Sequence, residues 1–448
     1  MKGQPFRIEH MPTLRNRRLE QLLGGLIDES LTYSQVKGLI PATAEGPDLD
    51  FKRDTYGSSN SDRKKLCGDV GALANANGGI LILGMDEDEQ GRAATDTGVN
   101  ISDDERRRLR QTVYGNIQPT PTFDVIPVED PSRPGTGFLI LWVARSANAP
   151  HAYVNENKGL LYPKRIGTET VWLSESEVAE AYRARFAGLS SRMEEAARVE
   201  AQFAQRHAKD ELFVVVTLVP DAPGSFTVDA AALQAFQLSN ASQQAGAFGI
   251  PVRRFSRSTV RHRRLVGTGS LEPSKPYSRG ACELHENGNG AFSTAVSSTV
   301  SGNEDLGADL VDTQWLTLGI GAGLRFLAHH AQSRAATGGH ATVRATIWPV
   351  IRPVALVSNL GWPNEQVGET VTEKPFADTV ADIDDLSDGG VGLVATTHRL
   401  ASELFQSFGA PEVEQVTAAG GVRLPYWHRS GREDITRWAA AAGVEVHR

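Results

Sequence analysis

Residues 72–87, ALANANGGILILGMDE, contain the end of a helix, a glycine turn and a buried strand. The apolar stripe of Leu66, Val70 and Leu73 has helical spacing, and the helix is expected to end at Asn77-Gly78-Gly79, a typical C-cap and turn. The apolar run 80–85 that follows predicts a buried strand. This succession of a helix, a tight turn and a strand indicates a sheet with helices packed against it.

The flanking sequence extends the same pattern in both directions. Ser61 is expected to cap the helix that leads into this block, and Ser102 is expected to cap a helix over 103–117. Ser174 and Glu177 form a capping box for a further helix. Strands are expected over 48–54, 80–85, 123–128, 138–144 and 160–166, and the apolar strand 138–144 is expected to be central. The order predicts a compact α/β (α+β) domain.

The 448 residues are enough for two or three domains. We expect a first domain over 1–187, a helical connector over 188–210, which is rich in Ala, Glu and Arg, and a second α+β domain over 211–448. Expected elements of the second domain are strands over 212–220, 251–255, 259–266, 281–285, 291–296 and 342–348 and helices over 316–330 and 433–442. Its partner or trigger is left open.

Composition excludes several classes of protein. With 46 Lys and Arg against 54 Asp and Glu, the formal charge is -8, so a protein that coats nucleic acid non-specifically is disfavoured. Two cysteines, Cys67 and Cys282, exclude a disulfide scaffold and a four-cysteine zinc site. The chain shows no signal peptide and no run near the roughly 18 apolar residues of a membrane span. We therefore expect a cytoplasmic protein without membrane contact.

Acidic side chains and one lysine flank two of the expected strands. Asp50 and Lys52 lie two positions apart on a strand and share one face, Glu45 precedes that strand, and Asp86 follows the next. If the strands are neighbours, three carboxylates and one ammonium converge, which suits Mg²⁺ or Mn²⁺. Such a metal can polarise a phosphoryl oxygen and activate water, while lysine offsets charge in the transition state.

A simpler interpretation of these acids must be weighed. Because 54 of 448 residues are acidic, a pair five positions apart is expected by chance about six times. Asp48, Asp50 and Lys52 could equally form the solvated face of an edge strand, and Asp48 lies close enough to compete as a ligand.

The chain also resembles a known family. The elements Glu45-x4-Asp50-Phe51-Lys52, ALANANGGILILGMDE and LLYPKRIG (160–167) resemble the Schlafen AlbA-type domain over residues of about 30–185. The resemblance implies a metal-dependent endoribonuclease of structured RNA such as tRNA, with Glu45, Asp50 and Asp86 as catalytic metal ligands and Lys52 beside them. Bacterial relatives are often described as ATP-binding or regulatory proteins, and some are linked to phage defence.

This chain departs from the family pattern in two ways. The second acid is usually Glu, so Asp50 is one methylene shorter. Vertebrate relatives build a horseshoe from two lobes, whereas this chain has one clear lobe, so that a homodimer could supply the second.

Basic residues of the first domain are candidates for contact with a phosphate backbone, if they line one surface. They are Lys64, Lys65, Arg106, Arg107, Lys164 and Arg165. Ordinary solvated helix faces would explain them equally well. In the second domain, the arginines between Arg253 and Arg264 mark either an anionic partner's surface or the outward face of a strand.

The leading hypothesis is a Mg²⁺- or Mn²⁺-dependent endoribonuclease acting on RNA, plausibly tRNA, in phage defence. The alternative is a non-catalytic nucleic-acid-binding transcriptional regulator. An ATP-binding protein is a weaker alternative, because the chain has no Gly-Lys dipeptide and therefore no Walker A loop.

Overall fold

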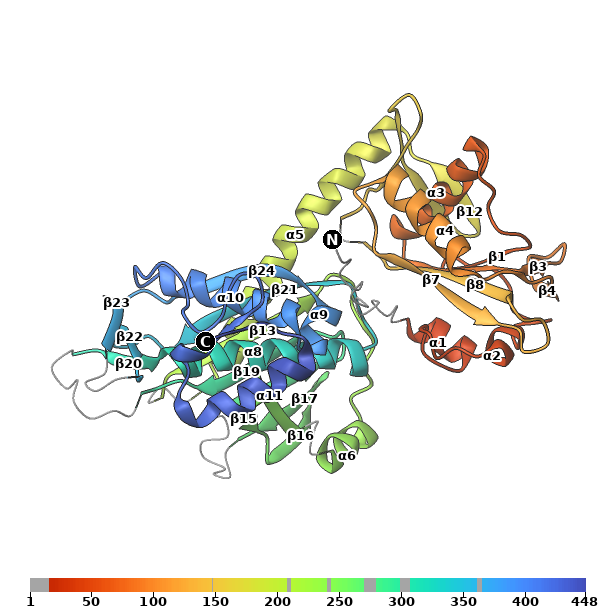
Figure 1. Ribbon diagram of the computed structural model, residues 1–448. Coiled ribbons are helices and arrows are strands. Elements are labelled where there is room, and N and C mark those ends of the chain that lie inside the picture. The colour runs from red at the N-terminus through yellow and green to blue at the C-terminus, as the bar shows by residue number, and fades with distance from the viewer. Residues whose placement is uncertain are drawn as a thin grey trace. The chain divides into compact units, whose positions relative to one another are not determined.

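The computed structural model describes residues 16–146, 148–207, 211–239, 243–269, 279–298, 307–360 and 365–448. The chain divides into two compact units, Met1–Leu189 and Ser190–Arg448 (Figure 1). Both units mix helices and strands, so the expected α+β fold class is confirmed.

The first unit is built on a five-stranded mixed sheet. Its strands are β1 (Leu49–Lys52), β2 (Gly79–Leu83), β8 (Thr136–Val143), β5 (Val99–Asn100) and β7 (Phe123–Glu129). β1 runs parallel to β2, and β8 is antiparallel to β2, β7 and β5, which confirms that β8 is central.

Alternate residues of this sheet enter two separate hydrophobic cores. Leu81 and Leu141 face α3 (Asn60–Ala74) and α4 (Asp103–Asn116), whereas Ile80 and Ile140 face the side of α1 (Arg17–Leu23) and α2 (Tyr33–Lys37). Helices therefore cover both faces of the sheet. Short strands complete the unit: β3 (Met85–Glu87) with β4 (Ala93–Asp96), β6 (Ile117–Gln118) with β9 (Ala152–Val154) and β10 (Leu160–Leu161), and β11 (Pro163–Ile166) with β12 (Glu169–Trp172).

Three local expectations need correction. The N-cap of α3 is Ser59 and not Ser61. The hydroxyl of Ser59 accepts a hydrogen bond from the backbone N–H of Asp62, and the side chain of Asp62 completes a capping box with Ser59. The expected strand over 160–166 is two strands, β10 and β11, that pair with different partners. The helix from Ser174 and the expected connector are one helix, α5 (Glu175–Ala204).

The second unit is built on a seven-stranded antiparallel sheet. In spatial order its strands are β16 (Arg257–Arg261), β17 (Arg264–Thr268), β18 (Ala281–His285), β19 (Gly290–Ala295), β13 (Phe213–Pro220), β21 (His340–Trp348) and β24 (Phe376–Asp382). The single strand expected over 259–266 is thus a hairpin of β16 and β17, with a turn at His262 and Arg263.

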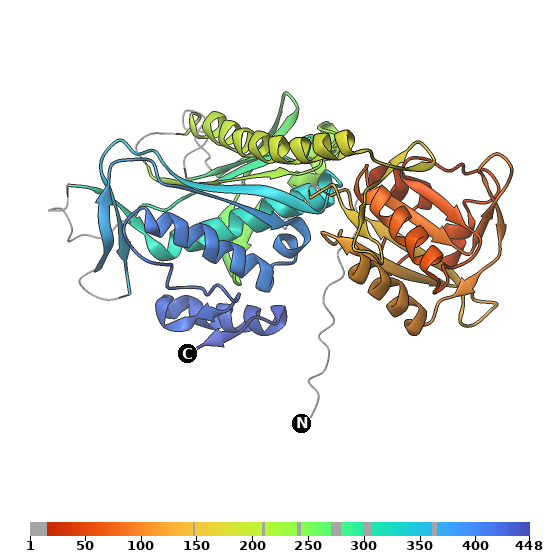
Figure 2. The ribbon, with the colours of Figure 1, turned by 90° about the horizontal axis from the view of Figure 1, so that it is seen from above.

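Two helices cover opposite faces of this sheet (Figure 2). Phe203 of α5 packs with Val215, and α8 (Thr313–His329) packs against the other face. Gly319 and Gly323 let α8 approach closely, because a Cβ at either position would lie within 2.8 Å of side-chain carbons of β13. These two glycines therefore serve the packing of α8 on the sheet.

The remaining elements of the second unit surround α8. They are α6 (Ala230–Leu238), β14 (Gln244–Ala247), β15 (Ile250–Arg254), β20 (Asp309–Asp312), a π-helix (His330–Arg334), β22 (Val354–Ser358), β23 (Glu365–Val371), α9 (Ile383–Asp388), α10 (Val391–Gln406), β25 (Val422–Arg423), short 3₁₀ turns (Leu424–Tyr426 and Arg429–Gly431), α11 (Arg432–Ala442) and β26 (Val446–His447). Of the helices in the described ranges, none has the length and apolar character needed to cross a membrane.

We predict that Gly79→Ala destabilises the first unit by more than about 3 kcal/mol. Gly79 has φ +148°, and a Cβ there would lie 2.3 Å from the carbonyl oxygen of Asp48, at the start of the neighbouring strand. Urea unfolding followed by circular dichroism measures the loss. Gly167→Ala is the matched control, because Gly167 also has positive φ but nothing lies within 4 Å of its Cβ position. The control should cost only about 1 kcal/mol, and equal losses would contradict the predicted clash.

Candidate functional site

Glu45 lies between β1 and the β3–β4 hairpin. Its Oε1 accepts a hydrogen bond from the backbone N–H of Phe51 at 2.8 Å, and its own N–H donates to the carbonyl of Gly91 at 2.8 Å. These two bonds hold Glu45 beside β1, as the sequence predicts.

Asp50 is almost fully buried, at 2% exposed, and has two cationic partners. Arg165 donates from Nη2 to Asp50 Oδ1 at 3.0 Å, and Lys52 Nζ lies 2.5 Å from Asp50 Oδ2. Burial alone would raise the pKa of Asp50, but a hydrogen bond with Glu45 and the charges of Lys52 and Arg165 lower it. Asp50 is therefore a neutralised carboxylate inside the unit.

Glu45 and Asp50 share this hydrogen bond between their side chains. Burial and the bond to Asp50 raise the pKa of Glu45 to about 8, so Glu45 carries a proton at neutral pH. Burial is the largest effect on Lys52 and acts to lower its pKa, but the charge of Asp50, the hydrogen bond to Asp50 and the charge of Asp69 together raise that pKa. Two of the three predicted carboxylates and the predicted lysine therefore lie together.

Asp86 does not join this group. Its Oδ2 lies 3.7 Å from Nη1 of Arg53, and its Oδ1 accepts from the backbone N–H of Glu87. The pairing of β3 with β4 shifts register between Asp86 and Glu87. Glu87 is the residue of β3 whose charge helps to raise the pKa of Glu45. The sequence motif predicts a role for Asp86, whereas it is the charge of its neighbour Glu87 that acts on Glu45.

The arrangement does not fit a divalent metal ion. Across the parts of the chain that the structure describes, which include Glu45, Asp50 and Asp86, no group of three or more His, Cys, Asp or Glu side chains is placed to hold one. A ligand carboxylate must be deprotonated and available to the metal. Asp50 is ion-paired twice, and Asp86 Oδ2 lies 3.7 Å from Nη1 of Arg53.

Asp48 does not compete for the same position. It is buried, accepts a hydrogen bond from Arg18 and lies 3.4 Å from Asn16 Nδ2. Its carboxylate thus ties the segment before β1 to the N-terminal helix.

Sequence reasoning missed two residues beside the site, the half-buried Asp69 and the buried Tyr56. Tyr56 donates from its hydroxyl to Asp69 Oδ2 at 2.7 Å, and burial raises the pKa of Asp69. The charge of Asp69 helps to raise the pKa of Lys52. Asp69 is on α3 among small and apolar residues, and an acid within an otherwise buried helix face was the signal available.

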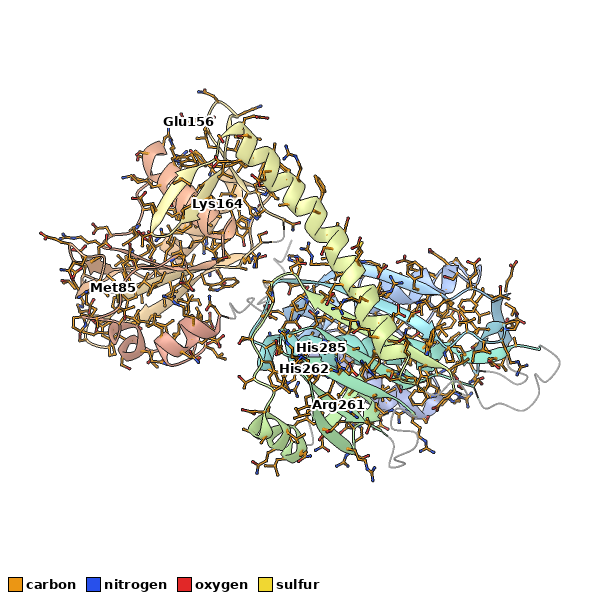
Figure 3. All side chains as sticks on the ribbon, turned by 180° about the vertical axis from the view of Figure 1, so that it is seen from behind. Met85, Glu156, Lys164, Arg261, His262 and His285 are labelled. Carbon is orange, nitrogen blue, oxygen red and sulfur yellow. The ribbon has the colours of Figure 1, made fainter. Side chains whose placement is uncertain are left out.

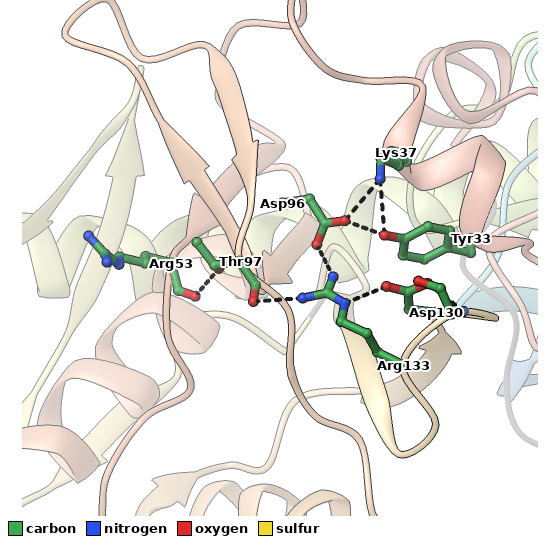
Figure 4. A network of polar contacts seen from close by, with 8 residues as sticks. Tyr33, Lys37, Arg53, Asp96, Thr97, Asp130 and Arg133 are labelled. Carbon is green, nitrogen blue, oxygen red and sulfur yellow. Dashed lines mark hydrogen bonds and ion pairs between the residues drawn. The ribbon is translucent and has the colours of Figure 1, made fainter.

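A polar network fixes the hairpin that carries Asp86 (Figure 4). Arg133 donates to Asp96 at 2.9 Å and to Asp130 at 2.6 Å, and Tyr33 donates to Asp96. At the other end of this network, Thr97 donates to the carbonyl of Arg53 at 2.7 Å. β4 is thereby tied to α2, to the β7–β8 turn and to the end of β1.

The predicted basic residues separate into two groups. Lys64 and Lys65 on α3 are exposed. Lys164 on the β11–β12 hairpin is also exposed and is labelled in Figure 3. Lys64 Nζ lies 5.3 Å from the ring centre of Trp172, which is 39% exposed. We call Lys64, Lys65, Lys164 and Trp172 the cationic face.

The other three basic residues have acidic partners. Arg106 and Arg107 pair with Asp103 and Asp104 one turn earlier on α4. The side chain of Arg165 is only 3% exposed and binds Asp50. Alternation on β11 places Arg165 inward and Lys164 outward, and contact of Arg165 with nucleic acid stays a prediction.

We predict that Arg165→Met lowers the free energy of unfolding by about 3 kcal/mol or more, because it leaves the buried Asp50 with a single cation. Lys164→Met is the matched control from the next position of the same strand and should change stability by no more than about 0.5 kcal/mol. Urea denaturation of both variants shows whether Arg165 stabilises the interior or lies at the surface as Lys164 does. Similar stability of the two variants would contradict the assigned ion pair.

One family model matches a range of residues that lies inside the first unit. The family model described as Schlafen, AlbA_2 matches residues 45–173, inside the range of the expected resemblance. No curated protein matches the chain.

Two solved structures show similarity to parts of the chain. The first is the DIP2311 protein from Corynebacterium diphtheriae, with 24% identity and a TM-score of 0.25 over 38% of this chain and 29% of that chain. This chain thus spans less than a third of that protein's length. The second is the N-terminal domain of a protein related to the ATP-dependent DNA helicase RecG from Nitrosomonas europaea, with 22% identity and a TM-score of 0.22 over 31% of this chain and 90% of that chain.

The glycine turn before β2, the acid-Phe-Lys strand β1 and the β11–β12 hairpin all fall within the matched range. Residues 45–173 of this chain therefore form a Schlafen AlbA_2 domain, and this domain contains the polar site described above.

Proposed function

We propose that this protein binds structured RNA through the cationic face of its AlbA_2 domain. The domain indicates a function related to nucleic acids. The observation that carries the proposal is the placement of Lys64 over the ring of the half-exposed Trp172, on the hairpin that also presents Lys164.

The three lysines are available to a phosphate backbone. Among the described residues, no carboxylate lies within ion-pair distance of Lys64, Lys65 or Lys164. Arg106 and Arg107, by contrast, already have acidic partners. Lysines that neutralise phosphates release counterions, which gives affinity without sequence preference.

Trp172 adds an aromatic surface on which an unpaired base can stack. Stacking on an aromatic side chain contributes about 1–3 kcal/mol per base. Unstacked bases occur in the loops and bulges of structured RNA, whereas a regular duplex hides them. Together, the lysines and Trp172 favour a folded RNA with exposed loop bases, of which tRNA is the example to test.

Substitutions on the cationic face should weaken binding of tRNA. Lys64→Gln and Lys164→Gln should each reduce the slope of log K against log salt by about 0.7–0.9, the value for one lost phosphate contact. Trp172→Ala should weaken binding by about tenfold with little change in that slope. Fluorescence anisotropy with labelled tRNA at several salt concentrations measures both quantities.

Arg107→Gln is the control, because Asp104 already offsets its charge. Its affinity and salt slope should stay close to those of the unmodified protein. If Arg107→Gln weakens binding as much as Lys64→Gln, the contact surface is on α4 and the proposed face is wrong.

Cleavage of the bound RNA is a second candidate function, and the Glu45–Asp50 pair favours it. A carboxyl that keeps its proton at neutral pH can act as a general acid towards a leaving oxygen. Lys52 beside it can stabilise the negative charge that develops on a phosphate. Metal-dependent endoribonuclease activity, a homodimer and a role in phage defence stay predictions, since the carboxylates do not fit a metal in their present arrangement.

Cleavage is tested by incubating the protein with tRNA in Mg²⁺, in Mn²⁺ and in EDTA, together with Glu45→Gln and Lys52→Met. For an acid–base site, we expect discrete products that disappear with Glu45→Gln and persist in EDTA. Loss of the products in EDTA and with Asp86→Asn would instead establish the metal-dependent reaction. Intact tRNA in all conditions, with salt-sensitive binding retained, would overturn cleavage and leave the binding proposal.

A further inference from the structure

A cavity of about 470 Å³ lies within the second unit. It is bounded by the β14–β15 hairpin, α8, α9 and α11; β15, α8 and α11 are labelled in Figure 1. Its size falls in the range of sites for small molecules. Side chains that line it include Ile250, Arg325, Phe326, His329, Ser387 and Trp438.

Glycines hold the hairpin and the helices around this cavity in close contact. A Cβ on Gly249 would lie 2.8 Å from Cβ of Trp438, and a Cβ on Gly321 would lie 2.9 Å from the ring of Phe248. The ring of Phe248 also lies 5.3 Å from that of Trp438. Trp438 is therefore held at the cavity by packing, so its ring forms a preformed aromatic wall.

Two side chains that can donate hydrogen bonds line the cavity from one face of α8. Arg325 and His329 are four residues apart and share one helix face. Both are exposed. A Cβ on Gly389 would lie 2.9 Å from Nε of Arg325, so the absence of a side chain there leaves room for the guanidinium.

The charge of Arg325 has no acidic partner on the described part of the chain, because no carboxylate there lies within 4 Å of it. Arginines elsewhere in the same unit, such as Arg344 and Arg206, are paired with carboxylates. An unpaired guanidinium at the rim of an aromatic cavity is suited to an anion, since its planar fork can donate two parallel hydrogen bonds.

We propose that this cavity binds a small organic anion that carries a flat ring, with the ring against Trp438 and Phe326 and the anionic group at Arg325. Ser387 lines the same cavity, and its hydroxyl donates to Gln332 Oε1 at 3.0 Å. Nucleoside monophosphates and aromatic carboxylates share this chemistry. The proposal is independent of the RNA-binding face, because every residue that it uses belongs to the second unit.

Thermal unfolding of the full chain tests the proposal with probes that separate the two chemical features. The anionic ring compounds are AMP, GMP, CMP, UMP and indole-3-acetate, and the partial probes are adenosine and inorganic phosphate. We expect at least one anionic ring compound to raise the melting temperature at millimolar concentration, and each partial probe to bind at least about tenfold more weakly than that compound.

Arg325→Gln should weaken binding of the active compound by about tenfold or more, because a hydrogen bond to a charged group is lost. The substitution is at an exposed position, so folding should be preserved. Arg437→Gln is the matched control: Arg437 is on α11 next to Trp438 but pairs with Glu433 and Asp434, and it does not line the cavity.

Three results would overturn the proposal. The first is an unchanged melting temperature with all five anionic ring compounds. The second is equal affinity for adenosine and AMP, which would show that the anionic group is not recognised. The third is equal affinity in Arg325→Gln and Arg437→Gln, which would place the binding site elsewhere.

Discussion

The buried ion pair between Asp50 and Arg165 is the interaction on which the first unit most depends. It joins β1 to the β11–β12 hairpin across 115 positions of sequence, and both side chains are almost completely withdrawn from water. A buried charge that loses its partner is strongly unfavourable. The hairpin is therefore held where Arg165 can reach Asp50.

This constraint also orients the rest of the hairpin. With Arg165 inward, Lys164 on the same strand faces outward, and Trp172 packs against α3 near Lys64. The same ion pair withdraws the charge of Asp50 from the surface and leaves Glu45 as the carboxyl that holds a proton. A surface suited to nucleic acid and an interior polar cluster thus arise from one arrangement of β1 and β11. Asp50 and Glu45 therefore contribute to the architecture of this domain.

In the second unit, the packing depends instead on glycines that let helices and strands lie close to one another. Glycines of α8 allow the helix to lie directly on β13, and Gly249 allows the β14–β15 hairpin to lie against α11. Aromatic rings fill the remaining space, with Phe248 between Trp427 and Trp438. The cavity beside Arg325 is the space left between the β14–β15 hairpin, α8, α9 and α11.

The sequence by itself determined most elements of the first unit and the AlbA-type domain, because periodicity, helix caps and the glycine turn at 77–79 are local signals. It also determined that Asp50 and Lys52 share a strand face and that Glu45 lies near them. Only the tertiary structure decided that Arg165 is buried, that Asp86 turns to Arg53 and that Asp69 lies near Lys52. The physical reason is that ion pairing and burial depend on which distant segments meet. Local spacing can place a charge on a strand, but it cannot identify the partner that neutralises it.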